Sequence, residues 1–542
     1  MKSRPLRTIL GLTAVVGIAV VAGILVSKNI GAPVLTPLKL SGATVDVEKV
    51  NTALQASWKE HDVAPTLAAD PLTLARRLSL SLTGAPPSLE EIRRLEALPA
   101  DADPVQAWLD HLLADRRFAD YTAERFARAF LGTETGPFIV YRRRRFVNWL
   151  ADQLTINRPY DRIVHDMVAA EGVWTTQPES NFITVAVIQD GENKGPDEVK
   201  LAARTSRAFL GFSLDCVECH DDKFSDQWKQ EDFHQLAAFF AQAEMSISGV
   251  SDDKEKNYDY RFNGMQEDQT VPAVLPYQAE LSPERDNRRA MLADWITHDE
   301  NRPFARAAVN RTWALLFGRP LIDPVDDIPL DGPFPAGFEE LTDTFIASGH
   351  DLHQLIRTIA ATDAFQRDSR SPDPDSPVTR EQEDAWAAFP VTPLRPEQVA
   401  GSIIQASSLQ PLDANTHIVQ KFRRFSETRD FVKRYGDQGE AEFQEESGTI
   451  PQRLLLMNGK LVGERIKPNP VMNAPARLAG FDADNEKVIE AAFLTAFTRY
   501  PDTAEQEHFV SLIENERNKA RGRAMSDIYW ALFNSTEFSW NR

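Results

Sequence analysis

The chain has 542 residues, of which 80 are acidic and 60 basic, and its formal net charge is −20. At about 100–200 residues per domain, this length accommodates several domains with packed cores. The content of hydrophobic residues (42%) and charged residues (26%) is ordinary for globular proteins and excludes disordered and fibrous classes. The acidic balance argues against nucleic-acid binding, which requires a basic surface.

The N-terminus predicts export. Lys2, Arg4 and Arg7 precede an uncharged stretch over residues 8–26, which as a helix would span about 28 Å, close to the hydrocarbon thickness of a bilayer. Residues 1–28 are therefore predicted to be either a retained signal anchor in the inner membrane or a signal peptide cleaved near Ala22. The anchor is favoured because the apolar run continues past that residue. Both interpretations place the bulk of the chain in the periplasm or cell envelope.

A tether and lead-in at residues 29–70 precede a mostly helical pattern. Pro71 opens a run with apolar residues at helical spacing, and Gly84 ends it. Ser88 and Glu91 form a predicted capping box for the next helix. Further helices are expected around residues 104–115, 119–131, 143–155 and 160–170, with others after Pro196 and around Phe233.

Residues 246–284 break the helical pattern. They are polar and rich in turn residues, with a short alternation over 258–262, and they predict an irregular or β linker. A second helical region follows at 285–540, with Gly318 as a helix C-cap, a linker by composition at 371–377, and Ser526 as an N-cap. The predicted fold class is mainly α, with multi-helix lobes separated by a small irregular or β insertion.

The two cysteines stand together as Cys216-Val-Glu-Cys219, and His220 follows directly. Cys-x-x-Cys-His is the attachment signature of c-type haem. Two thiols three residues apart on a helical turn can form thioethers with the two vinyl groups, and the adjacent imidazole then becomes the proximal iron ligand. The sequence therefore predicts covalent haem c on Cys216 and Cys219, with iron bound by His220.

Other interpretations of this motif stay open. A plain disulfide or redox pair is compatible with an oxidising compartment. A four-cysteine zinc site is excluded by the cysteine count, and Cys216, Cys219 and the adjacent His220 are awkward as three ligands of one tetrahedral ion. An inert pair or a different metal is the third alternative.

Haem also needs apolar walls and a defined distal side. Phe212 and Trp228 are the candidates for the pocket, although for either one alone ordinary core packing is the better explanation. The candidates for the distal iron ligand are Met245, Met265 and His234. An open distal site fits the sequence as well.

Several segments resemble a known family. They include residues 74–87 (Leu-Ala-Arg-Arg-Leu-Ser-Leu-Ser-Leu-Thr-Gly-Ala-Pro-Pro), 209–221 around the cysteines, 228–240, 301–313, 454–458 and 531–538. Together they resemble planctomycete-type cytochrome-like proteins built from two domains of unknown function, families 1549 and 1553. The resemblance implies a cytochrome-like domain at 71–245 and a second helical domain at 285–540. A histidine often found two residues after the motif in that family is Asp222 here.

The expected function is electron transfer or haem-linked redox chemistry at the cell envelope, with a basic redox partner that the acidic surface would favour. The alternative is a non-redox envelope scaffold or binding module, related to polysaccharide handling, in which the cysteines form a disulfide. A hydrolase of unrecognised type is a third class. The familiar hydrolase, phosphate-binding and zinc-protease motifs are absent, so no catalytic residue is assigned.

Overall fold

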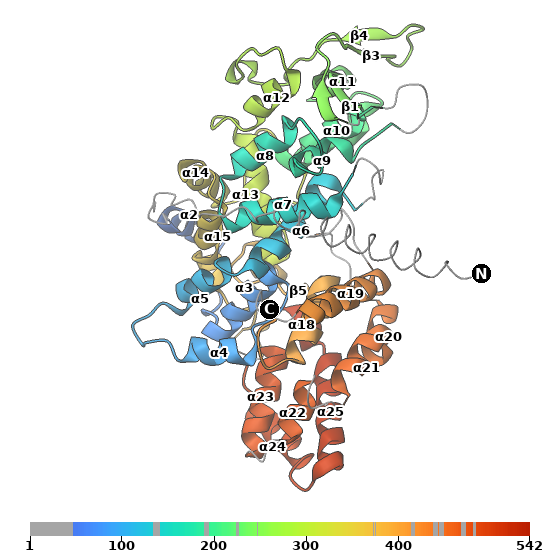
Figure 1. Ribbon diagram of the computed structural model, residues 1–542. Coiled ribbons are helices and arrows are strands. Elements are labelled where there is room, and N and C mark those ends of the chain that lie inside the picture. The colour runs from blue at the N-terminus through green and yellow to red at the C-terminus, as the bar shows by residue number, and fades with distance from the viewer. Residues whose placement is uncertain are drawn as a thin grey trace, which may run out of the picture. The chain divides into compact units, whose positions relative to one another are not determined.

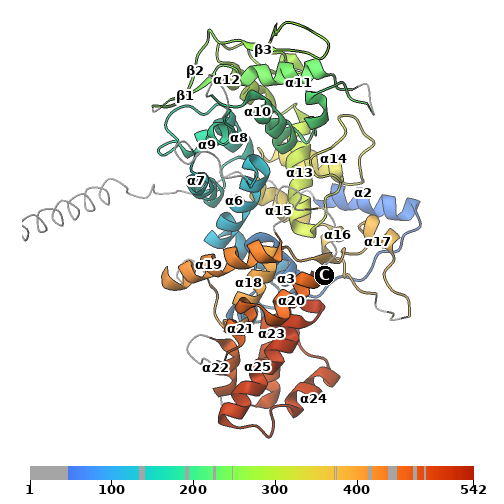
Figure 2. The same cartoon turned by 90° about the vertical axis from the view of Figure 1, so that its right-hand side faces the viewer.

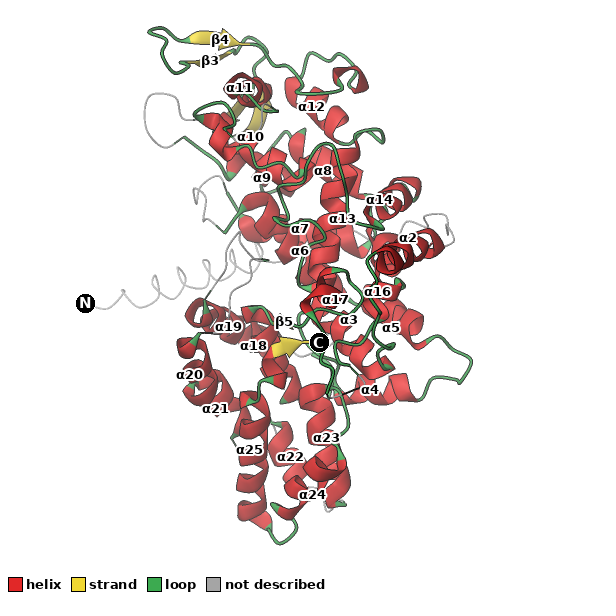
Figure 3. Ribbon diagram, turned by 180° about the vertical axis from the view of Figure 1, so that it is seen from behind, coloured by secondary structure: helices red, strands yellow, loops and turns green. Residues whose placement is uncertain are grey.

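Helices make up most of the described chain, and its strands pair only in twos (Figure 3). This confirms the predicted mainly α fold class. The computed structural model describes residues 47–133, 141–188, 195–223, 227–246, 248–371, 373, 375–412, 418–436, 443, 449–467, 473–480 and 484–542, with only the backbone for 418–426. The predicted signal anchor or signal peptide at 1–28 lies outside the described residues. Within them, no helix is both long enough and apolar enough to cross a bilayer.

Local capping chemistry sets the first helices. Helix α3 (Pro71–Thr83) begins at Asp70, whose carboxylate accepts hydrogen bonds from two backbone amides of the first turn, and it ends at Gly84 with φ +68°. A capping box between Ser88 and Glu91 starts α4 (Leu89–Glu96). Both helices were predicted, the first from Pro71 and Gly84 and the second from Ser88 and Glu91, and both predictions are confirmed.

The remaining elements before the cysteine motif are helical. They are α2 (Val47–Glu60), α5 (Pro104–Leu113), α6 (Arg116–Leu131), α7 (Arg143–Thr155), α8 (Tyr160–Val168), η1 (Pro178–Ser180), α9 (Asn181–Thr184), α10 (Glu198–Thr205) and the π-helical turn η2 (Ser206–Leu210).

Short helices and two hairpins surround the motif and follow it. They are η3 (Asp215–Glu218), α11 (Gln230–Ala237), η4 (Ala238–Phe240), β1 (Ala243–Ser246), β2 (Gly249–Asp252), β3 (Tyr258–Tyr260), β4 (Gln269–Val271) and η5 (Ala279–Leu281). Strands β1 and β2 pair antiparallel, as do β3 and β4. The β3–β4 hairpin lies beside α11 (Figures 1 and 2). The predicted β insertion therefore consists of two separate hairpins.

A further helical group follows the hairpins. It comprises α12 (Arg288–Ile296), α13 (Arg302–Phe317), α14 (Phe338–Ala347), α15 (Leu352–Ala360), α16 (Asp363–Gln366) and α17 (Arg380–Asp384). Helix α13 is buried along almost its whole length and contacts α3, α14 and η2. It ends at Gly318 with φ +82°, as predicted.

The C-terminal elements form a group of their own. They are β5 (Thr392–Pro393), α18 (Pro396–Ala406), α19 (Ile418–Tyr435), α20 (Ile450–Asn458), α21 (Lys460–Ile466), α22 (Ala474–Gly480), α23 (Asn485–Phe497), α24 (Thr503–Ser511), α25 (Asn518–Asn534), η6 (Glu537–Ser539) and β6 (Trp540–Asn541). Strand β6 pairs with β5, which returns the end of the described chain to the start of this group.

Buried apolar side chains form two cores. The first core takes residues from Val50 to Phe389, together with Phe443, so the regions predicted as separate domains at 71–245 and 285–540 both contribute to it. The second core takes residues from Leu394 to Phe538. It also includes Leu80 of α3, a helix that otherwise packs in the first core. Helix α3 therefore contributes to both.

The predicted N-cap at Ser526 is wrong. Helix α25 begins eight residues earlier, at Asn518, and Ser526 lies inside it. Its hydroxyl donates hydrogen bonds to Gly522 O at 2.9 Å and to Ile466 O at 2.6 Å. A serine whose hydroxyl binds the carbonyl four residues earlier fits within a helix. The start of α25 was therefore predicted wrongly, because it was inferred only from the preference of serine for N-cap positions.

Candidate functional site

The chain enters the cysteine motif through an abrupt helix end. Helix α10 widens into the π-helical turn η2 and stops at Gly211, which has φ +72°. A Cβ atom there would lie 2.9 Å from Ile328 Cδ1, and Gly211 O accepts a hydrogen bond from Ile328 N at 2.7 Å. The left-handed backbone favours glycine, and the close approach of Ile328 leaves little room for a side chain.

The cysteines lie on a short 3₁₀ turn. Val217 N donates to Leu214 O at 3.0 Å, and Cys219 N donates to Cys216 O at 3.4 Å. Val217 is buried and anchors the turn in the first core. Cys216 and Cys219 are both exposed, and both thiols are free. The turn therefore presents two free thiols at its surface.

His220 follows with one defined ring nitrogen. Its Nδ1 lies 2.7 Å from Asp221 O. Because a carbonyl oxygen only accepts, Nδ1 carries the proton and donates it, and neutral His220 then has its lone pair on Nε2. Histidines that bind metals characteristically donate their other N–H to a carbonyl or carboxylate in this way.

Side chains from other elements hold the motif's backbone. Glu218 O accepts hydrogen bonds from Gln230 Nε2 at 3.0 Å, from His234 Nε2 at 3.0 Å and from Tyr260 Oη at 3.5 Å. Asn263 Nδ2 donates to Cys219 O at 2.5 Å. The carbonyls of Glu218 and Cys219 are thus both held by hydrogen bonds, from side chains of α11 and of the β3–β4 hairpin.

His234 is fully buried, and both of its ring nitrogens have partners. Nε2 donates to Glu218 O, so Nδ1 accepts from Tyr258 Oη, 2.9 Å away. The ring stacks on Tyr260 with centroids 3.4 Å apart. Burial lowers the pKa of His234, and the hydrogen bond to Glu218 only partly offsets that effect. To act as a distal ligand, His234 would have to release one of these bonds.

The two pocket candidates lie together. The rings of Phe212 and Trp228 have centroids 5.3 Å apart, and Phe212 also meets Tyr277 at 6.0 Å. Trp228 O accepts a hydrogen bond from Asp222 N at 3.0 Å, which ties the tryptophan to the segment just after the motif. Phe212 is buried and Trp228 is half-buried. The structure therefore brings both residues to the motif's side of the first core.

The two methionine candidates have different surroundings. Met245 lies in β1, where it is paired with Val250 of β2. Met265 lies in the turn that follows β3, is 46% exposed, and is two residues from Asn263, the residue that binds Cys219 O. The turn that carries Met265 is thus in direct contact with the motif.

Acidic groups surround the motif. Burial raises the pKa of Glu218, and the carboxylates of Asp197 and Asp215 raise it further. Burial likewise raises the pKa of Asp327, with additional contributions from Asp326 and Asp222. Among the described residues, no cluster of three or more His, Cys, Asp or Glu side chains could hold a metal ion.

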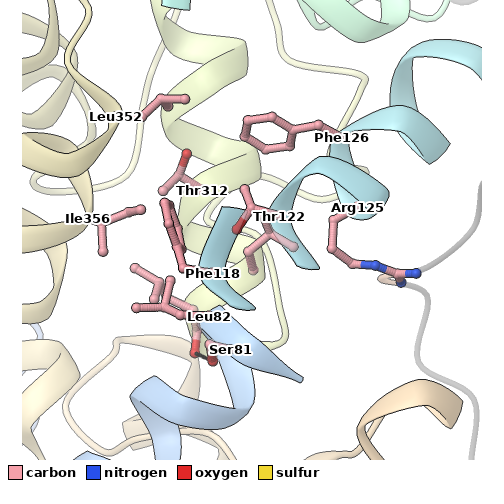
Figure 4. A pocket seen from close by; sticks show the side chains of 11 residues that line it. Ser81, Leu82, Phe118, Thr122, Arg125, Phe126, Thr312, Leu352 and Ile356 are labelled. Carbon is pink, nitrogen blue, oxygen red and sulfur yellow. Dashed lines mark hydrogen bonds between the residues drawn. The ribbon is translucent and has the colours of Figure 1, made fainter. Parts of the chain in front are cut away.

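A small cavity of about 20 Å³ lies elsewhere in the first core, among residues of α3, α6, α13 and α15 (Figure 4). Apolar side chains such as Phe118, Leu82 and Ile356 line most of it, whereas the Arg125 guanidinium points away from the others. This space is about that of one water molecule. None of its lining residues belongs to the cysteine motif.

Four residues that hold the motif were not predicted as part of the site: Gln230, Tyr258, Tyr260 and Asn263. The alternation over 258–262 did indicate a strand, which is the element that carries the two tyrosines. Gln230, Tyr260 and Asn263 contact backbone carbonyls of the motif that lie 12 to 44 residues away, and Tyr258 acts through His234. The sequence has no pattern for such contacts.

Comparison with known families matches the two regions of this chain. The family PSCyt2, described as a protein of unknown function (DUF1549), matches residues 49–245, and PSD1, also described as a protein of unknown function (DUF1553), matches residues 288–441. The chain therefore carries one region that matches each family, which confirms the predicted resemblance to proteins built from both. No curated protein and no solved structure matches it.

Proposed function

We propose that the protein is a c-type cytochrome-like electron-transfer protein of the cell envelope. The observation that carries this proposal is His220, whose Nδ1–H is bound to Asp221 O and whose Nε2 is therefore ready to bind iron, directly beside two exposed free thiols. Haem bound there would supply one-electron transfer.

The residues of this chain have separate roles in the proposal. Cys216 and Cys219 hold the macrocycle through thioethers, and His220 Nε2 is the proximal ligand. Phe212 and Trp228 supply apolar surface next to the motif. Among the distal candidates, Met265 is favoured over Met245 and His234, because its turn contacts Cys219 and its side chain is exposed. The thioether sulfur of a methionine would raise the reduction potential relative to a second histidine.

Location and partner follow from charge and the N-terminal sequence. The apolar stretch at 8–26 supports export, with anchoring in the inner membrane or release after cleavage. The acidic residues around the motif favour a basic redox partner whose docking weakens as salt increases.

The test is to express the full chain together with a cytochrome c maturation system. We expect covalent haem in denaturing gels and a reduced-minus-oxidised spectrum on addition of dithionite. Cys216→Ser and Cys219→Ser each leave at most one thioether, and His220→Gln removes the proximal ligand, so all three variants should lose the normal spectrum. His61→Gln, which changes an exposed histidine far from the motif in sequence, is the matched control and should load haem normally.

One result would contradict the cytochrome proposal and support the alternative. If no haem is attached and the thiols react only after reduction, the two cysteines form a disulfide. The protein would then be an envelope scaffold or binding module, with polysaccharides as the first ligands to test.

A further inference from the structure

His234 joins three elements that meet behind the cysteine motif. It belongs to α11, its Nε2 donates to Glu218 O of the motif, and its Nδ1 accepts from Tyr258 of β3. Its ring also stacks on Tyr260 of the same strand. Because the side chain is fully buried, these bonds are shielded from competition with water.

The carbonyl that accepts from His234, Glu218 O, lies where a backbone shift would move the Cys219 side chain. Glu218 directly precedes Cys219, so its carbonyl belongs to the peptide unit that sets the direction of the Cys219 side chain. The two cysteines are exposed, and their own packing fixes them little. Their geometry therefore depends on how firmly the backbone beneath them is held.

We propose that His234 is a positioning residue, which fixes the peptide between Glu218 and Cys219 so that the second thiol and His220 are presented in one geometry. It acts through the neutral tautomer with the proton on Nε2, which Tyr258 selects by donating to Nδ1. Gln230 donates a second hydrogen bond to the same carbonyl, Glu218 O, and Asn263 donates one to the next carbonyl, Cys219 O. The consequence for haem attachment rests on the proposed function, whereas the consequence for the thiols does not.

The two cysteines provide an internal comparison. Cys216 precedes the held carbonyl and Cys219 follows it, so a loosened peptide should affect Cys219 more. A glutamine at position 234 can present an amide N–H near the place of His234 Nε2, whereas leucine fills space without a donor. Simple loss of packing would not distinguish the two thiols and would not be rescued by a donor.

The experiment measures alkylation rates of Cys216 and Cys219 in the reduced, haem-free full chain, with each cysteine resolved by peptide mass spectrometry. In His234→Leu, the ratio of the Cys219 rate to the Cys216 rate should rise about fivefold, the factor that corresponds to losing one ordinary hydrogen bond. His234→Gln should stay near the wild-type ratio. Tyr258→Phe should give a smaller rise in this ratio. The phenylalanine ring keeps the packing of Tyr258, but it has no hydroxyl to donate to His234 Nδ1, so the His234 tautomer is no longer selected.

The matched control is His353→Leu. The ring of His353 also packs against an aromatic ring, that of Phe118 at a centroid distance of 5.3 Å, but it lies in α15, which packs on α5, α13 and α14. Its substitution should leave the ratio unchanged. If His234→Leu does not fold, the ratios in His234→Gln and Tyr258→Phe still decide the question.

An unchanged ratio in folded His234→Leu, or an equal rise in His353→Leu, would overturn the positioning role. Haem loading separates this result from the proposed function. If wild type loads haem, the yield should fall in His234→Leu and recover in His234→Gln. If wild type loads none, the cytochrome proposal fails, and the thiol ratios alone determine the role of His234.

Discussion

The cysteine motif and the second core hold their backbones by different means. The motif is a short irregular turn with two exposed cysteines, and polar groups from α11 and β3 form hydrogen bonds to its Glu218 carbonyl. The second core consists of helices whose backbone groups form hydrogen bonds within each helix and whose apolar faces pack together. Phe533 and Phe538, for example, have ring centroids 4.9 Å apart. Residues that must stay exposed for chemistry gain little from burial, so their geometry has to come from neighbours that are buried.

The largest expected effect tests whether the two cores are energetically separate. Phe533→Ala removes a fully buried ring from the second core and should lower the free energy of unfolding by about 3–5 kcal/mol. Chemical denaturation followed by circular dichroism would show an earlier transition, while alkylation of Cys216 and Cys219 stays at the wild-type rate. If the thiols become reactive together with that transition, the two regions unfold as one.

A comparably large effect is expected at the buried ion pair behind the hairpins. Arg289 and Asp252 are bonded through Nε at 2.8 Å, and Arg289 Nη1 also donates to Val168 O and Ala170 O. Arg289→Ala leaves a buried carboxylate without its cation and should cost about 3–5 kcal/mol in thermal or denaturant unfolding. Lys254→Ala, which breaks an exposed pair with Asp286, is the matched control and should cost less than about 1 kcal/mol. Equal costs would show that burial does not determine the strength of these pairs.

Acid should separate the cores because, among the described residues, the histidines whose pKa is lowered by desolvation all lie in the region of the first core. Burial lowers the pKa of His353 to about 4, with Asp351 opposing the shift and Arg357 adding to it. The unfolded chain takes up a proton near pH 6.5 and the folded protein does not. The stabilising contribution is therefore complete above pH 6.5 and is lost as the pH falls to about 4, by up to about 3 kcal/mol.

The measurement for this effect is the denaturation midpoint of each core between pH 7 and pH 4. The first core should lose stability more steeply than the second, and His353→Leu should flatten that dependence. The same slope in His353→Leu and wild type would assign the acid sensitivity to other groups.

The smallest effect is expected at the tip of the β3–β4 hairpin. Arg261 and Asp268 form a pair at 2.8 Å, but both side chains are more than half exposed. Arg261→Ala should change the free energy of unfolding by less than about 0.5 kcal/mol and leave the thiol ratio unaffected. A large change in either measurement would mean that the Arg261–Asp268 pair, in addition to His234 and Asn263, holds the motif.

Sequence patterns predicted the helices whose ends are set by neighbouring residues. Asp70 and Gly84 bound α3, and Ser88 with Glu91 starts α4, because capping bonds span only a few residues. Ser526 shows the limit of such reasoning. Its hydroxyl could cap a helix or bind a carbonyl within one, and contact with Ile466, 60 residues away, accompanies the second arrangement.

The sequence by itself determined the mainly α fold, the pairing of the two families, and the spacing of Cys216, Cys219 and His220, because each depends on neighbouring residues or on a pattern along the chain. Only the tertiary structure decided that both family regions share the first core, that α3 also reaches the second, and that His234 faces a backbone carbonyl of the motif. The physical reason is that every residue has the same backbone carbonyl, so the sequence does not mark which carbonyl a side chain will bind. Which side chain reaches it depends on how distant elements pack, and the local sequence does not specify that packing.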